Sequence, residues 1–194
     1  MAGPSLQRII SVICMRRWSE DGLTTGSEWK RVSLPALAGG TLAAVAFLIY
    51  AVADSDGFLF LDYVNLPFHE FGHLFFGVLG ETAGVWGGTL MQLIIPAGIL
   101  LYFLVRKETG GVFFSSFWLG ENLLNIAVYI NDARTLALPL VGGGEHDWNI
   151  ILGHFGMLRH DHTIAGVVKA LGWFIMIAAT LWFPAMGMLR RKEG

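Results

Sequence analysis

Long runs of apolar residues alternate with short polar segments along this chain. Three runs carry no charged side chain and cover residues 32–53, 82–105 and 170–189. Each has the roughly 20 residues that a helix needs to cross a bilayer while satisfying its own backbone hydrogen bonds. A fourth run, 109–131, contains a single charged residue, Glu121. The pattern therefore predicts about four transmembrane helices.

A fifth apolar run, residues 68–79, is too short to span comfortably, because 12 helical residues extend only about 18 Å. If this segment enters the membrane and returns, ten basic residues lie on the cytoplasmic side, and three (Arg134, Arg159 and Lys169) lie outside. If it crosses fully, the distribution becomes eight against five. Since Lys and Arg favour the cytoplasmic side, a re-entrant helix is predicted, with both termini cytoplasmic.

The composition supports an all-α integral membrane protein. Of the 194 residues, 54% are hydrophobic and 14% charged, and the mean hydropathy is +0.57. This composition carries more apolar surface than a soluble domain of this size can bury. A formal charge of −2 without a basic block argues against a nucleic-acid partner, and one cysteine excludes an internal disulfide and a thiolate metal cage. Residues 32–194 form the predicted polytopic domain. Residues 1–31 precede it as a basic segment, either a helix on the cytoplasmic surface or a frayed tail.

The short apolar run carries an H-E-x-x-H motif, formed by His69, Glu70 and His73. Pro67 comes just before it and is expected to lie before the helix begins. Histidines four residues apart project from one helical face and can share a metal ion, and catalytic zinc keeps one position for a water molecule. Glu70 is the candidate general base for that water. Two histidines and a glutamate inside a membrane are costly unless they are paired or coordinated, which favours a metal site.

These residues resemble the site-2 protease family of intramembrane zinc metallopeptidases. The resemblance covers roughly residues 60–150: the His69-Glu70-Phe-Gly-His73 sequence on a hydrophobic helix, a glycine-rich connection at residues 84–88, and a new span from residue 89. It implies a zinc ion held by His69 and His73, Glu70 as the base, and a third ligand from a later segment. A metallopeptidase-like core is expected over about 60–160.

The third ligand departs from the family pattern, since no Leu-Asp-Gly sequence occurs. A second polar cluster at residues 142–149 supplies the candidates, and three glycines allow its backbone to approach a site closely. Asp147 is favoured by analogy with the family's ligands and His146 is the alternative, with the other residue supporting the ligand. The competing interpretation is that Asp147 only caps the helix that follows.

A further polar set interrupts the fourth run, where Glu121, Asn125 and Asp132 are spaced to share one helical face and Asn122 lies beside them. Ionisable residues at membrane depth normally face the protein interior or a water-filled cavity. Contact with a substrate or support of the metal site is one interpretation. Hydrogen bonds that fix helix packing are an equally good one.

Two functions compete. The first is a membrane metalloprotease, a hydrolase that cleaves a peptide bond of a membrane-protein substrate in or beside the lipid bilayer. The second is a non-catalytic subunit that keeps a metallopeptidase-like fold within a larger membrane complex. A role of the histidines as axial ligands to a pigment is disfavoured, because two histidines one turn apart beside a glutamate fit zinc better.

Overall fold

The computed structural model describes residues 28–54, 57–140 and 145–192, with side chains up to residue 189. Within these residues the fold is all-α, as predicted, and no strand occurs. Its α-helices are α2 (Leu34–Ala53), α3 (Asp62–Gly77), α4 (Glu81–Val105), α5 (Thr109–Asn131), α6 (Asp147–His154) and α7 (Asp161–Lys192), and a short 3-10 helix, η2 (Leu158–His160), precedes α7. Most of the predicted basic segment 1–31 and the glycines at 142–144 lie outside the described residues.

Among the described residues, three helices are long and apolar enough to cross a membrane: Leu34–Ala53, Glu81–Val105 and Leu158–Leu189. This is consistent with a membrane protein, but it is one fewer than the four predicted. The fourth run does form a helix, α5, with the predicted bounds. It falls short of the other three because Glu121, Asn122, Asn125 and two serines dilute its apolar residues.

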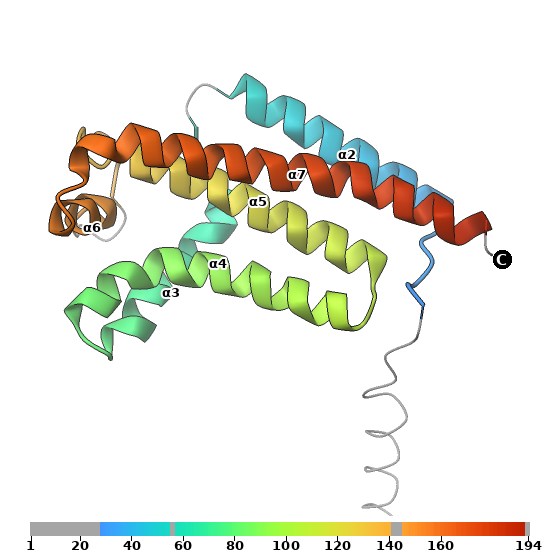
Figure 1. Ribbon diagram of the computed structural model, residues 1–194, viewed down its shortest axis with the longest axis horizontal. Coiled ribbons are helices and arrows are strands. Elements are labelled where there is room, and N and C mark those ends of the chain that lie inside the picture. The colour runs from blue at the N-terminus through green and yellow to red at the C-terminus, as the bar shows by residue number, and fades with distance from the viewer. Residues whose placement is uncertain (1–27, 55–56, 141–144, 193–194) are drawn as a thin grey trace, which may run out of the picture.

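Figure 1 shows that the long helices lie roughly along the long axis of the molecule, with α4 and α7 running in one direction and α2 and α5 in the other. The amino end of α2, the connection between α4 and α5 and the carboxyl end of α7 lie at one end, and α6 lies at the other. Contacts tie the first end together: the Lys30 backbone N–H donates to the Lys107 carbonyl at 2.9 Å, and Lys30 Nζ lies 2.6 Å from Glu108 Oε1. Basic residues from separate connections therefore gather at the end opposite α6.

The helix that carries the H-E-x-x-H motif, α3, starts earlier than the sequence predicts. It begins at Asp62 and encloses Pro67, which was expected to lie before it. The buried Asp62 carboxylate accepts the Leu59 N–H at 2.6 Å and organises the turn that opens the helix. Pro67 has no N–H to donate to the carbonyl of Tyr63, four residues earlier, so one helical hydrogen bond is missing. Tyr63 is exposed and lies near the start of the helix, where such a loss is tolerated.

α3 folds back against α4 and accompanies only part of its length (Figure 1). Gly80, with a φ of 120°, provides the turn between them. The two helices touch at Gly72 and Gly87, where a Cβ on Gly72 would lie 2.1 Å from the Gly87 carbonyl oxygen. Glycine at both positions thus allows the backbones to meet.

α5 occupies the centre of the bundle and packs against both α4 and α7. It crosses α7 at a second close glycine contact, where a Cβ on Gly120 would lie 2.8 Å from the Gly172 carbonyl oxygen. One apolar cluster joins α5 to α6 and α7 and includes Ile130, Trp148 and Ile151. These contacts hold the start of α6 against α5 and α7, and Val85, Trp86 and Leu93 of α4 pack against the same cluster.

Candidate metal centre

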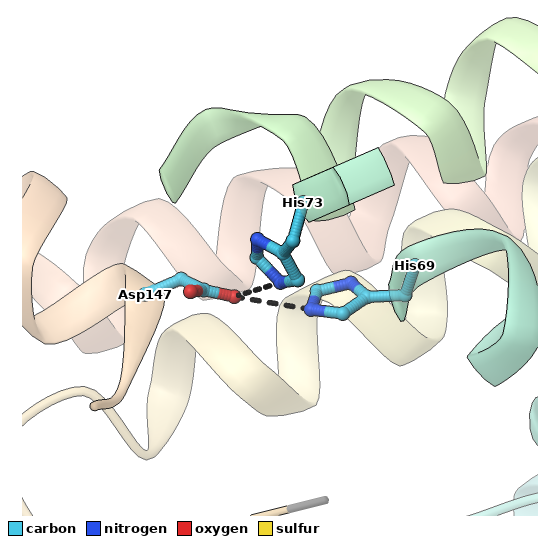
Figure 2. A group of neighbouring side chains, drawn as sticks. All are labelled: His69, His73 and Asp147. Atoms are coloured by element: carbon cyan, nitrogen blue, oxygen red, sulfur yellow. Dashed lines mark hydrogen bonds and ion pairs between the residues drawn. The ribbon is translucent and has the colours of Figure 1, made fainter. Parts of the chain in front are cut away.

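Three side chains from two helices meet at the end of the bundle near α6. His69 and His73 lie one turn apart on α3, and Asp147 lies in the first turn of α6. Asp147 Oδ2 is 3.0 Å from His69 Nε2 and 3.2 Å from His73 Nε2, and the three ligand atoms all lie within 4.8 Å of one another. Figure 2 shows the carboxylate facing both imidazole rings. Tetrahedral zinc ligands lie roughly 3.3 Å apart, so the donor set fits a zinc ion.

The hydrogen bonding of His73 shows which ring atom is free to bind a cation. His73 Nδ1 lies 2.8 Å from the Gly84 carbonyl oxygen, which can only accept, so Nδ1 carries the proton. In the neutral ring, the Nε2 lone pair then points at Asp147 Oδ2, which is also an acceptor. Two acceptors 3.2 Å apart repel each other unless a cation lies between them. The arrangement therefore calls for a metal ion or a proton.

Gly88 leaves space beside both histidines. A Cβ at this position would lie 2.6 Å from His69 Nε2 and 2.6 Å from His73 Nε2. The residues around it, 84–88, were predicted to form a glycine-rich connection, but they lie inside α4. Their glycines bring α4 close to α3, and Gly88 keeps a side chain away from the candidate ligand atoms.

Asp147 and His146, the two candidates for the third ligand, have different surroundings. Only Asp147 joins the group of possible ligands; His146 is the N-cap of α6, where its Nδ1 accepts the Asn149 N–H at 3.3 Å. His146 Nε2 faces away from the cluster, 3.4 Å from Asp132 Oδ2. Capping, which was the competing role for Asp147, is therefore carried out by its neighbour. The Asp147 backbone N–H donates to the Tyr129 hydroxyl at 3.2 Å, which helps to hold the start of α6 in place.

A cavity of about 800 Å³ opens beside this cluster. It is lined by all three candidate ligands and by Glu70, which is half-buried next to them on α3. Apolar side chains from α3, α4, α5, the segment before α6 and α6 itself complete the wall, including Leu66, Val85, Val128, Leu138 and Ile150. The cavity thus offers a carboxylate and an apolar surface on the same side of the candidate metal centre.

The four polar residues predicted on the fourth run separate into different environments. Asn125 lines the cavity, and its Oδ1 accepts a hydrogen bond from Gln92 at 2.9 Å. Glu121 and Asn122 are buried away from the cavity; Glu121 accepts from Asn65, and Asn122 donates to the Trp118 carbonyl within its own helix. Only Asn125 therefore reaches the site directly.

Asp132, the fourth member of this set, lies just after α5 and organises the following loop. Its carboxylate accepts from Thr135 Oγ1 and from the backbone N–H groups of Ala137 at 2.9 Å and Leu138 at 3.0 Å. Burial alone would raise the pKa of Asp132, but these hydrogen bonds outweigh it and lower the pKa from its usual 3.8. Asp132 therefore holds in place the loop that carries Leu138, a residue of the cavity wall.

Two residues of the site, Gln92 and Tyr129, carry no prediction from the sequence, and a third, Gly88, was predicted only as part of a glycine-rich connection. The Gln92 side-chain oxygen lies 2.8 Å from His69 Nδ1, and the Tyr129 ring packs against His69 with the centroids 5.8 Å apart. The signal for Gln92 was present, since it is a lone amide within an apolar span, four residues after Gly88 and so on the same face of α4. No protein-family model, curated protein or solved structure matches the chain.

Proposed function

We propose that this protein is an intramembrane zinc metalloprotease of the site-2 protease type. The observation that carries the proposal is the convergence of His69 Nε2 and His73 Nε2 on Asp147 Oδ2, at 3.0 and 3.2 Å. Two imidazoles and a carboxylate form a three-ligand set typical of catalytic zinc, which keeps its fourth position for water or substrate. Gly88 leaves room beside the ligand atoms, and the adjoining cavity gives a substrate access to them.

Glu70 is the proposed general base. Zinc supplies Lewis acidity when bound, lowering the pKa of a water molecule and polarising the carbonyl of the scissile peptide bond. Glu70 accepts the proton of the attacking water and then delivers it to the leaving amine. Its place next to His69 on α3 and on the wall of the same cavity supports this role. A purely structural zinc site has no need of a base and closes its fourth position.

In the proposed membrane arrangement α5 is a fourth span and α3 is re-entrant. The 23 residues of α5 form a helix of about 34 Å, which is long enough to cross a bilayer. The polar side chains of α5, such as Glu121, are buried inside the bundle. The contact between Lys30 and Lys107 supports a re-entrant α3, because a crossing α3 would send these residues to opposite sides. With both termini cytoplasmic, the metal centre lies towards the outer face.

The proposed substrate is a segment of another membrane protein that unwinds beside α3. The apolar side chains that line the cavity suit such a segment, and an unwound strand exposes the carbonyl that hydrolysis requires. Lipid surrounds the outer faces of α2, α4 and α7, where residues such as Leu42, Leu101 and Phe174 are exposed.

The test is zinc content and hydrolysis in matched variants of the detergent-purified protein. Wild type is expected to hold close to one zinc per chain and to cleave labelled single-span peptides reconstituted with it. Glu70→Gln should keep the zinc and lose the cleavage, because it retains the shape of the side chain but not its basicity. His69→Ala should lose both.

Equal cleavage by wild type and Glu70→Gln would overturn the catalytic proposal. Zinc without cleavage of any peptide in wild type would favour the alternative, a metallopeptidase-like subunit of a larger complex. The search would then move to membrane proteins that co-purify with the chain. Absence of zinc from the wild type, purified without chelator at neutral pH, would overturn the metal centre itself.

A further inference from the structure

The two candidate histidine ligands are oriented by different kinds of partner. The Gly84 carbonyl holds His73, and a carbonyl can only accept a hydrogen bond. The partner of His69 Nδ1 is the side-chain amide of Gln92, at 2.8 Å. An amide can present either its oxygen or its NH₂ group, so Gln92 alone does not decide which nitrogen of His69 carries the proton.

The next residues in the chain of hydrogen bonds decide it. Gln92 Nε2 lies 2.9 Å from Asn125 Oδ1, and the Asn125 side chain also interacts with the Asp62 carboxylate. A carboxylate accepts, so Asn125 must turn its NH₂ group towards Asp62 and its oxygen towards Gln92. Gln92 then donates to Asn125 and presents its own oxygen to His69. The series of hydrogen bonds has one direction, set at Asp62.

Two N–H groups hold Asp62 in the accepting role, and the neighbouring Glu121 carboxyl is a third hydrogen-bond partner, which must be protonated to donate to Asp62. The Leu59 backbone N–H donates to Asp62 Oδ2 at 2.6 Å. The Asn65 NH₂ group faces Asp62 Oδ1 at 3.5 Å and Glu121 Oε2 at 2.8 Å, and its orientation is fixed because the Trp118 indole N–H donates to Asn65 Oδ1 at 2.8 Å. Asp62 is almost fully buried, so solvent does not compete for these bonds.

We infer that Gln92 is a positioning residue that holds His69 in the tautomer protonated at Nδ1, under the control of Asn125 and Asp62. In this tautomer the Nε2 lone pair points at the cation position, as it does in His73. With the opposite tautomer, Nε2–H would donate to Asp147 Oδ2 at 3.0 Å and occupy the place of the cation. This inference deepens the proposed function and rests on its metal centre.

The test compares two replacements of Gln92 that separate positioning from packing. Gln92→Glu keeps an oxygen that accepts from His69 Nδ1, whereas Gln92→Met keeps the length and fills the buried space but has no acceptor. Zinc affinity, measured by competition with a chelator, should stay close to wild type in Gln92→Glu and fall about 10 to 100-fold in Gln92→Met. A packing role predicts the reverse order, because Met is the better guest in an apolar site and a buried glutamate is costly.

A second measurement needs no metal. In protein labelled with ¹⁵N-histidine and stripped with chelator, the ring ¹⁵N shifts of His69, assigned by their loss in His69→Gln, report which nitrogen carries the proton. Wild type should carry a proton on Nδ1, and a second proton on Nε2 is compatible with the inference because Nε2 faces Asp147 Oδ2 at 3.0 Å when the metal is removed. Gln92→Met should show a mixture or the Nε2–H form, and Asp62→Asn, which allows the series to reverse, should shift in the same direction.

The outcomes distinguish this inference from the proposed function. If wild type holds zinc but Gln92→Met binds it as tightly, the inference is wrong and the metal centre is retained. If wild type holds no zinc while His69 is in the Nδ1–H form and changes in Gln92→Met, the positioning is supported and the proposed function fails. A wild-type His69 in the Nε2–H form overturns the inference whatever the metal content.

Discussion

Adding one methyl group at Gly88 tests whether the cation lies beside this residue. In Gly88→Ala the new Cβ would lie 2.6 Å from both histidine Nε2 atoms, so the rings must move and the ligand geometry is lost. Zinc affinity is expected to fall by about tenfold or more, although no ligand has changed. Isothermal titration of the metal-free protein with zinc measures the effect.

Gly98→Ala is the matched control for this substitution. It lies on the same helix, and a Cβ there would meet no atom within 4 Å. It should bind zinc like wild type, and its stability should not decrease, since alanine favours a helix over glycine by about 1 kcal/mol. Equal affinities in the two variants would show that the cation does not lie beside Gly88.

Substitutions at Asp147 and His146 distinguish a ligand from its neighbour. Asp147→Asn replaces a carboxylate with a neutral amide and should lose nearly all the zinc. His146→Asn should keep it, because asparagine is a good N-cap and His146 faces Asp132 instead of the cluster. Metal content by atomic absorption gives the answer, and zinc loss confined to His146→Asn would reverse the assignment.

Single residues show what the sequence can and cannot predict about the site. The pairing of His69 with His73 follows from helical periodicity, because residues four apart share a face. The distance from Asp147 to that pair is set by how α6 packs on α5, which no local pattern specifies. Gln92 escaped notice for the same reason: an isolated amide in an apolar span gains meaning only when its partner on another helix is known.

Among the helices and loops, the loop after α5 depends on the ionised Asp132. Its lowered pKa means that the ionised carboxylate is more stable in the folded protein than in the unfolded chain. This contribution is fully present above the usual pKa of 3.8 and is lost as the pH falls through the lower folded-state value. Asp132→Asn should therefore lower the free energy of unfolding by about 1–2 kcal/mol near pH 7.

Thermal denaturation in detergent across pH checks this expectation. Both proteins should be stripped of metal first, because acid also protonates the zinc ligands. The difference in midpoint between wild type and Asp132→Asn should shrink towards zero as the pH falls below 4. A difference that does not change with pH would mean that the hydrogen bonds of Asp132 do not require its charge.

The bounds of α4 and α5 were predicted closely, whereas α7 starts at Asp161, nine residues before the uncharged run 170–189. α5 has the predicted bounds, and α4 differs from its prediction only in starting at Glu81 instead of residue 82. The predicted start of α3 was wrong because the buried contacts of Asp62 extend the helix to the amino-terminal side of Pro67. These contacts come from Leu59 and from residues of α5. The glycines at 84–88 were misassigned because glycine is common both in turns and where two membrane helices touch.

At the scale of the whole molecule, the ends of the bundle make the proposed membrane arrangement testable by cysteine labelling. The native Cys14 is replaced by serine, and single cysteines are introduced at the exposed Arg31, just before α2, and the exposed Arg159, in η2 just before α7. The amino ends of α2 and α7 lie at opposite ends of the bundle (Figure 1). Gly110→Cys and Asn131→Cys do the same for the two ends of α5, where both positions are exposed. A membrane-impermeant maleimide added to intact cells should label Arg159→Cys and Asn131→Cys. It should reach Arg31→Cys and Gly110→Cys only after the membrane is opened. Labelling of Gly110→Cys and Asn131→Cys from the same side would show that α5 does not cross, and labelling of Arg31→Cys and Gly110→Cys from opposite sides would show that α3 does.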